Sequence, residues 1–230
     1  MADGATPRMA TAQKNLFAME GGMTTPRNNP TITPGGFRSP ARIDLLGLAH
    51  KTDTELDKYP KRRQALERLR AVGLVSEESF KNATPKQVAA AHRAYFDHVL
   101  ASAGGADALE TIRDDHAASV LADTMFQHGA SGGTLIIQRA VNRRLKELGK
   151  NILLDEDEKM SPDVLAYYNN LVSERDSRER LMQHMVEERR RYMKEAGQDL
   201  DSGEETRFTY YRGGSATGDN SVLRVRAAPP

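Results

Sequence analysis

The stretch from Leu121 to Asn142, LADTMFQHGASGGTLIIQRAVN, decides the fold of this chain. Gly129 interrupts it, so the stretch predicts one helix that ends before this glycine and a second helix that Ser131 can cap. The second helix has a wide apolar face, formed by Leu135, Ile136, Ile137, Ala140, Val141, Leu145 and Leu148. A face of that breadth predicts a central, well-buried helix.

Helical signals continue on both sides of this stretch. Thr84, Pro85 and Gln87 supply an N-cap, a proline at the first helical position and a capping-box partner, so a helix is expected to begin there. The helix that ends before Gly129 is expected to begin at about Ala106. Ser161, Pro162 and Asp163 predict another helix start of the same kind, with an N-cap followed by a proline. A last long helix is expected over residues 176–196. These elements predict a mainly α protein, a compact domain of five or six helices.

The two ends of the chain differ from this helical part. Prolines and glycines are frequent in the first 40 residues, which predicts a flexible N-terminal arm over residues 1–13 and irregular structure over about residues 23–42. Between them, residues 14–20 fit a short helix that ends at Gly21. Residues 197–230 form a C-terminal extension with two open interpretations, a hairpin that pairs RFTYY with SVLRVR, or a tail.

Composition excludes several classes of protein. Lys and Arg number 33 and Asp and Glu number 32, so the chain lacks the strong positive charge of a dedicated nucleic-acid binder. It has no cysteine, which excludes disulfides and thiolate zinc sites. No apolar run is long enough to span a membrane, and the N-terminus lacks the pattern of a Sec signal peptide. We therefore expect no nucleic-acid partner and no membrane span, and any export is expected to use a non-Sec route.

Two runs of like charge have simple interpretations. The acidic run from Asp155 to Glu158 lacks the spacing of a calcium-binding loop, and it is therefore interpreted as a solvated loop. The run Arg189-Arg190-Arg191 follows two glutamates directly, which indicates a salt-bridged helix face rather than a phosphate-binding patch.

Three separated motifs, taken in order, resemble one known family. The first is Glu20-Gly21-Gly22 at the end of a hydrophobic helix, and the others lie in residues 121–142 and 154–165. Together they are similar to the N-acetylmuramidases of glycoside hydrolase family 108 with their associated peptidoglycan-binding domain. The matching positions beyond the first motif are Asp123, Phe126, Gln127, Gly129, Ile137, Gln138, Ala140, Asp155, Pro162, Leu165, Arg189 and Tyr192.

The resemblance implies a lysozyme-like helical domain over residues 14–196, in which residues 84–196 form the half similar to a peptidoglycan-binding domain. It implies hydrolysis of the β-1,4 bond after N-acetylmuramic acid, with no cofactor and no metal. Glu20 is then the general acid, Gly21 and Gly22 let the sugar chain approach the backbone, and Gln127 and His128 line the cleft. Structural roles are expected for three further positions of the motifs: Asp123, Gly129 and Gln138.

Two alternatives stay open. Glu20 also fits an ordinary charged residue before a glycine C-cap, and the residues assign no second catalytic group. Residues 23–43 depart from the family and the chain has no tryptophan, which suits a non-catalytic peptidoglycan-binding or structural component of a phage particle or secretion apparatus. The expected partners are peptidoglycan glycan strands and a larger phage or secretion assembly. We expect synthesis in the cytoplasm and action in the periplasm, on the cell wall or in a virion.

Overall fold

Helices make up the part of the chain that the structure describes. The computed structural model describes residues 8–12, 15, 63, 67, 70–74, 79, 84–198 and 202–213. The elements in these residues are five α-helices and two short 3-10 helices, with no strand among them. The prediction of a mainly α-helical protein is confirmed.

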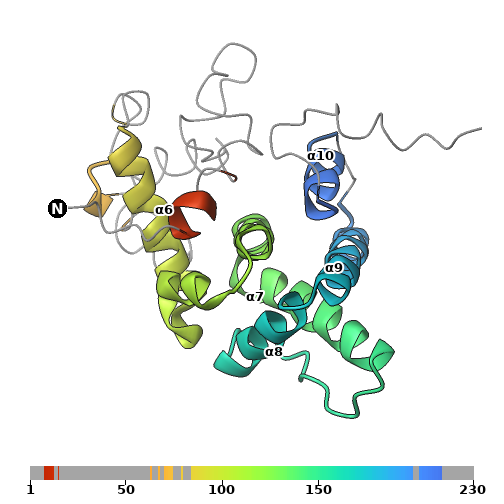
Figure 1. Ribbon diagram of the computed structural model, residues 1–230. Coiled ribbons are helices and arrows are strands. Elements are labelled where there is room, and N and C mark those ends of the chain that lie inside the picture. The colour runs from red at the N-terminus through yellow and green to blue at the C-terminus, as the bar shows by residue number, and fades with distance from the viewer. Residues whose placement is uncertain are drawn as a thin grey trace, which may run out of the picture.

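Most of the elements follow one another with short connections. The elements are α6 (Pro85–Val99), η1 (Ala101–Ala103), η2 (Gly105–Thr111), α7 (Asp115–Glu147), α8 (Pro162–Val172), α9 (Arg175–Glu195) and α10 (Ser202–Tyr211). The longest connection, residues 148–161, joins α7 to α8. In Figure 1, α7 lies between α6 on one side and α9 with α10 on the other, and α8 lies below it. Most of the core is formed where α9 and α8 pack on α7, and α10 packs on α9.

Two helices begin where the sequence predicts, because their caps are local. The Gln87 backbone N–H donates to Thr84 Oγ1, and the Thr84 N–H donates to Gln87 Oε1, which completes the capping box of α6. At the start of α8, the Val164 N–H donates to Ser161 Oγ. These contacts satisfy backbone donors that the first turn of a helix leaves free.

The segment before Gly129 differs from the prediction of a continuous helix from Ala106. Residues 105–111 form the 3-10 helix η2, and α7 begins only at Asp115. The reason is a second cap, because Asp114 has an extended backbone conformation and its side chain accepts a hydrogen bond from the Ala117 N–H at 2.7 Å.

The C-terminal segment RFTYY is helical, so the hairpin interpretation is wrong for this segment. It belongs to α10, whose buried residues follow the spacing i, i+3, i+4 and i+7 of a helix face: Glu204, Arg207, Phe208 and Tyr211. Aromatic and β-branched residues favour strands locally, but the packing of this face on α7 and α9 outweighs that preference.

Part of the predicted N-terminal arm is packed on the helical domain. Residues 8–12 are helical, and Met9 and Ala12 are buried. Arg8 forms an ion pair with Asp115 at 2.8 Å, and the Met9 N–H donates to Glu110 at 2.7 Å. The prediction of a flexible arm is therefore wrong for residues 8–12, because two buried side chains and these polar contacts attach them to η2 and α7.

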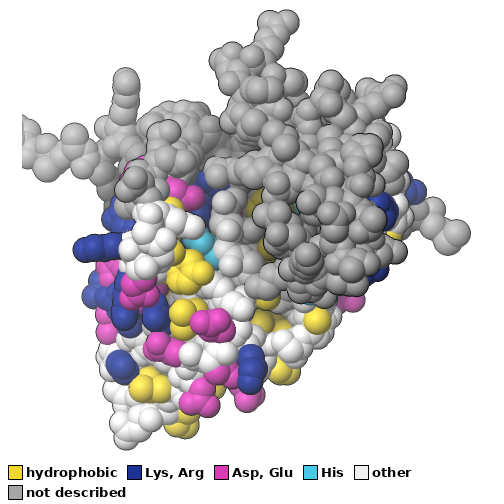
Figure 2. Space-filling model, turned by 180° about the vertical axis from the view of Figure 1, so that it is seen from behind, with side chains coloured by type: hydrophobic (Ala, Val, Ile, Leu, Met, Phe, Trp, Pro, Cys, Tyr) yellow, Lys and Arg dark blue, Asp and Glu magenta, His cyan; other side chains and the backbone are white. Residues whose placement is uncertain are grey.

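Charges of both signs share the described surface. Figure 2 shows Lys and Arg side chains gathered along one edge, with Asp and Glu side chains among them. On α9, Arg190 forms an ion pair with Glu205 and Arg191 with Glu195, as the interpretation of a salt-bridged face predicts, whereas Arg189 is buried. Among the described helices, none is both long and apolar enough to cross a membrane.

Candidate functional site

Gly129 breaks α7 into two halves. Its φ of 70° and ψ of −172° lie in a region of backbone conformation that is essentially restricted to glycine. The chain therefore changes direction here, and the helix that precedes Gly129 and the helix that follows it present different faces to the core. The structural role predicted for Gly129 is this break in the helix.

Two further glycines after the break allow close packing. A Cβ atom on Gly132 would lie 2.4 Å from Tyr192 Oη, and one on Gly133 would lie 2.9 Å from Met125 Cα. The sequence Gly132-Gly133 thus lets α9 and the first half of α7 approach the second half of α7.

His128 lies at this break and packs edge-on against the Tyr192 ring, with the ring centroids 5.3 Å apart. Its Nε2 atom is buried and has no hydrogen-bond partner among the described residues. Burial, together with the positive charge of Arg189, lowers the pKa of His128 from 6.5 to about 3. The imidazole is therefore neutral at physiological pH. Gln127, beside it, is half-buried.

The lowered pKa of His128 predicts an acid-sensitive fold. The unfolded chain binds a proton on this histidine below about pH 6.5 and the folded chain only near pH 3, so stability falls as the pH drops through this window. Between pH 7 and pH 5, the unchanged protein is expected to lose about 1–2 kcal/mol more free energy of unfolding than a His128→Phe variant. Urea unfolding at both pH values measures this difference, with His98→Gln on the exposed face of α6 as the control. An equal loss in the protein and in the phenylalanine variant would contradict the prediction.

A cluster of four charged side chains fills the core between α7, α9 and α10. Asp123 Oδ2 lies 2.8 Å from Arg189 Nη1, and Asp123 Oδ1 lies 3.3 Å from Arg207 Nε. Arg189 Nη2 lies 2.7 Å from Glu204 Oε2, close enough for an ion pair although the angle does not make a hydrogen bond. Two carboxylates and two guanidinium groups make the cluster neutral in sum, and we call it the charged core cluster.

Hydroxyl groups complete the charged core cluster. Tyr211 donates to Asp123 Oδ2 at 2.8 Å, and Thr124 lies 2.8 Å from the same tyrosine oxygen. Burial alone would raise the pKa of Asp123, but the charges of Arg189 and Arg207 outweigh it and hold the pKa below its usual value. Burial raises the pKa of Tyr211, which stays protonated. In this structure Asp123 therefore joins α7 to α9 and α10 through its ion pairs.

Two buried amides of α7 hold the acidic loop. Gln138 donates to Asp157 Oδ1 and to the Lys159 carbonyl, and it accepts from the Glu158 N–H. One turn later, Asn142 pairs with both the N–H and the C=O of Leu154, at 2.7 and 2.9 Å. These amides take the place of backbone partners, so in this structure Gln138 and Asn142 hold the acidic loop on α7. The loop residues 155–159 themselves are exposed, as the interpretation of a solvated loop predicts.

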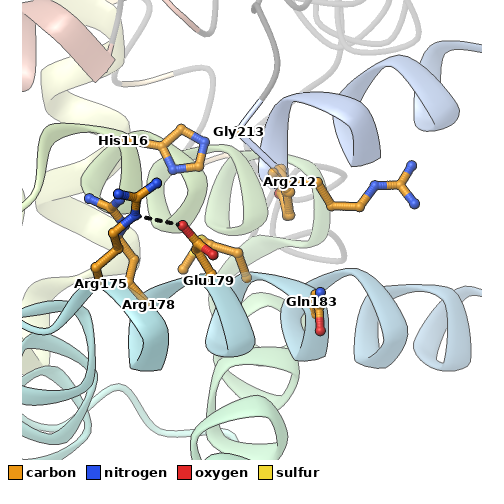
Figure 3. Close-up of a pocket in the computed structure, with 9 residues that line it drawn as sticks. His116, Arg175, Arg178, Glu179, Gln183, Arg212 and Gly213 are labelled. Atoms are coloured by element: carbon orange, nitrogen blue, oxygen red, sulfur yellow. Dashed lines mark hydrogen bonds and ion pairs between the residues drawn. The ribbon is translucent and has the colours of Figure 1, made fainter. Parts of the chain in front are cut away.

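An arginine-lined pocket of about 660 Å³ lies beside the charged core cluster, between α9, the start of α7 and the end of α10. We call it the arginine pocket, and its polar lining consists mainly of His116, Arg175, Arg178, Glu179 and Arg212. Figure 3 shows Arg175, Arg178 and Glu179 rising from α9 toward His116, while the Arg212 guanidinium points away from the other two arginines. The pocket also borders Met182 and Tyr211, whose side chains are almost fully buried.

The groups of the arginine pocket are positioned by contacts with their neighbours. Arg178 forms an ion pair with Asp114, the residue that caps α7, and Arg175 Nε lies 3.1 Å from Glu179 Oε1. His116 Nε2 lies 2.8 Å from the Tyr210 carbonyl oxygen. Because a carbonyl only accepts, this nitrogen carries the hydrogen.

The N-terminal segment reaches the same region through Asn15. Its amide Nδ2 donates to Ser119 Oγ at 2.9 Å and to Tyr210 Oη at 3.0 Å. Ser119 lies one helical turn after His116, and the Tyr210 ring contacts the His116 ring, with centroids 4.8 Å apart. The described residue nearest in sequence to Glu20 is thus attached next to the arginine pocket.

The predicted site residues fall into two groups. Gln127, His128 and Gly129 lie together at the helix break, but Glu20, Gly21 and Gly22 lie outside the described residues. Glu204, Arg207 and Tyr211 are not among the residues predicted from the sequence, although their helical spacing is a signal for a buried face. The same holds for Arg175 and Arg178, whose sequence surroundings resemble any charged helix face. Among the described residues, no three His, Asp or Glu side chains form a group that would hold a metal ion.

The described residues define a mainly α-helical protein with a charged core cluster and an arginine pocket. Comparison with protein-family models, with curated proteins and with solved structures finds no match to this chain.

Proposed function

We propose that this protein is a peptidoglycan hydrolase of the N-acetylmuramidase type, with Glu20 as its general acid. It cleaves the β-1,4 bond that follows N-acetylmuramic acid in the glycan strand. Support comes from the order of the three motifs that resemble the muramidase family. The proposal includes action on the cell wall, after delivery by a non-Sec route or as part of a phage particle or secretion apparatus.

The observation that carries the proposal is the attachment of Asn15 beside the arginine pocket. Glu20 follows Asn15 by five residues, and an extended chain advances at most about 3.6 Å per residue, so their Cα atoms are within about 18 Å of each other. The proposal assigns the glycan to the arginine pocket, whose volume is in the range that ligands occupy.

The chemistry of the pocket suits a sugar polymer. The arginine side chains of the pocket donate hydrogen bonds to hydroxyl and carbonyl oxygens of a glycan. A general acid must also keep its proton near neutral pH, which positive neighbours oppose. The ion pairs of Arg175 with Glu179 and of Arg178 with Asp114 weaken that opposing field.

The products of digestion test this function. Purified protein is incubated with insoluble peptidoglycan, and the new reducing ends are reduced with borohydride and identified. A muramidase leaves N-acetylmuramic acid at the reducing end, so muramitol is the expected product. Glucosaminitol or free peptide ends in place of muramitol would contradict the proposal. Sedimentation with the sacculus and no new ends would identify a non-catalytic peptidoglycan-binding protein instead.

A further inference from the structure

The arginine pocket contains two guanidinium groups whose donors are only partly used. Among the described residues, Arg175 is held by Glu179 through Nε, so both terminal nitrogens of Arg175 stay available. Arg178 contacts Asp114 through Nη1, and its side chain is 32% exposed, so the other donors of its fork still face solvent. A guanidinium offers five N–H donors in a plane that matches a carboxylate.

The geometry around Arg178 favours a defined ligand position. Asp114 is fixed because its side chain caps α7, and it holds the Arg178 guanidinium in place. Arg175, one turn earlier on α9, projects to the same side, as does Glu179 (Figure 3). A carboxylate that enters the pocket therefore meets one preorganised arginine, Arg178, and one exposed arginine, Arg175, whose side chain is 82% exposed.

We propose that Arg175 and Arg178 bind the carboxylates of the peptide stem that peptidoglycan carries on N-acetylmuramic acid. This inference rests on the proposed function, and it adds the part of the polymer that the pocket recognises. The stem peptides are short and end in carboxylates, whereas the glycan hydroxyls are neutral. The unused N–H donors of Arg175 and Arg178 favour a charged carboxylate over a neutral hydroxyl.

Binding of soluble muropeptides to the full chain tests the inference. The probe is the disaccharide N-acetylglucosaminyl-N-acetylmuramoyl tetrapeptide, which contains no bond of the kind that a muramidase cleaves. Its affinity is compared by calorimetry with that of the same molecule after amidation of its carboxylates, and with that of the disaccharide without peptide whose lactyl carboxyl is blocked as an amide. We expect the carboxylate form to bind at least about tenfold more tightly than either comparison ligand.

Two variants on α9 connect this preference to the pocket. The double variant Arg175→Gln, Arg178→Lys removes one charge and the planar fork of the other arginine, while the introduced lysine keeps a cation beside Asp114. It is expected to lose about tenfold in affinity for the carboxylate form and to bind the amidated form as before. The matched control is Arg191→Gln, because Arg191 pairs with Glu195 in the same i,i+4 arrangement but outside the pocket. Its affinity is expected to equal that of the unchanged protein.

The outcomes separate this inference from the proposed function. Equal affinity for the carboxylate and amidated forms overturns the inference, as does equal affinity for the peptide-free disaccharide with its lactyl carboxyl blocked as an amide. Either result leaves the proposed function intact if muramitol ends appear in the digestion. Binding that depends on the carboxylates, with no muramitol ends in the digestion, supports the inference and contradicts the proposed hydrolase activity.

If the double variant loses its helical circular dichroism, the single variant Arg175→Gln is used for the test, since Arg175 is exposed and does not contact the cap of α7. An unchanged affinity in that variant contradicts the role of Arg175.

Discussion

Replacing Arg189 by methionine is expected to lower the free energy of unfolding by about 3–5 kcal/mol. The side chain of Arg189 is fully buried and contacts Asp123 and Glu204, so its loss leaves two buried carboxylates with only Arg207 to balance them. Methionine fills much of the space but supplies no charge. Because Glu204, Arg207 and Tyr211 all belong to α10, the substitution is also expected to loosen this helix and to speed its cleavage by a protease.

Arg191→Met is the matched control for this substitution. Arg191 lies two residues later on α9, is exposed, and forms a surface ion pair with Glu195. Such pairs contribute about 0–1 kcal/mol, so the control is expected to unfold at nearly the same urea concentration as the unchanged protein. If the free energies of unfolding of the two variants differ by less than about 1 kcal/mol, the charged core cluster is not what holds α10 on α7 and α9.

Replacing Glu20 by glutamine is expected to reduce the rate of glycan cleavage by about 100-fold to 10,000-fold. The amide has the shape of the carboxylic acid but has no acidic proton to give to the leaving oxygen. The affinity for the glycan is expected to change little, since the lost proton donor stabilises the transition state and not the bound substrate. The rate is measured from the appearance of muramitol ends, and binding from sedimentation with the sacculus.

Glu205→Gln supplies the control for the glutamine substitution. Glu205 is exposed on α10 and pairs with Arg190, away from the lining of the arginine pocket. Its variant is expected to release muramitol ends at the rate of the unchanged protein. A Glu20→Gln variant that cleaves as fast as this control would exclude Glu20 as the general acid and favour an ordinary charged residue before the Gly21-Gly22 helix end.

Short-range signals predicted much of the helical fold. Thr84 and Ser161 cap their helices because the donor and acceptor lie three residues apart, so the contact depends on few other parts of the chain. Gly129 was predicted to end a helix, and its backbone angles are of a kind that only glycine adopts readily. Asp114 is the same kind of cap, but it was missed because apolar spacing continues through η2 into α7.

Less of the candidate site than of the fold could be predicted from the sequence. Asp123 and Arg189 were recognised as parts of separate motifs, but their contact joins residues 66 positions apart. The arginine pocket unites three segments, because His116, Arg178 and Arg212 come from α7, α9 and the end of α10. No local pattern marks such residues, since an arginine on a pocket wall and an arginine in solvent have the same neighbours in sequence.

The sequence by itself determined that this protein is mainly helical, where α6 and α8 begin and where α7 breaks. These features follow from hydrogen bonds and backbone angles within a few residues. The tertiary structure decided that RFTYY is a helix, that residues 8–12 pack against η2 and α7, and that four charges share one core. The physical reason is that burial and ion pairing depend on which distant segments meet, and those energies exceed the local preferences of a short segment.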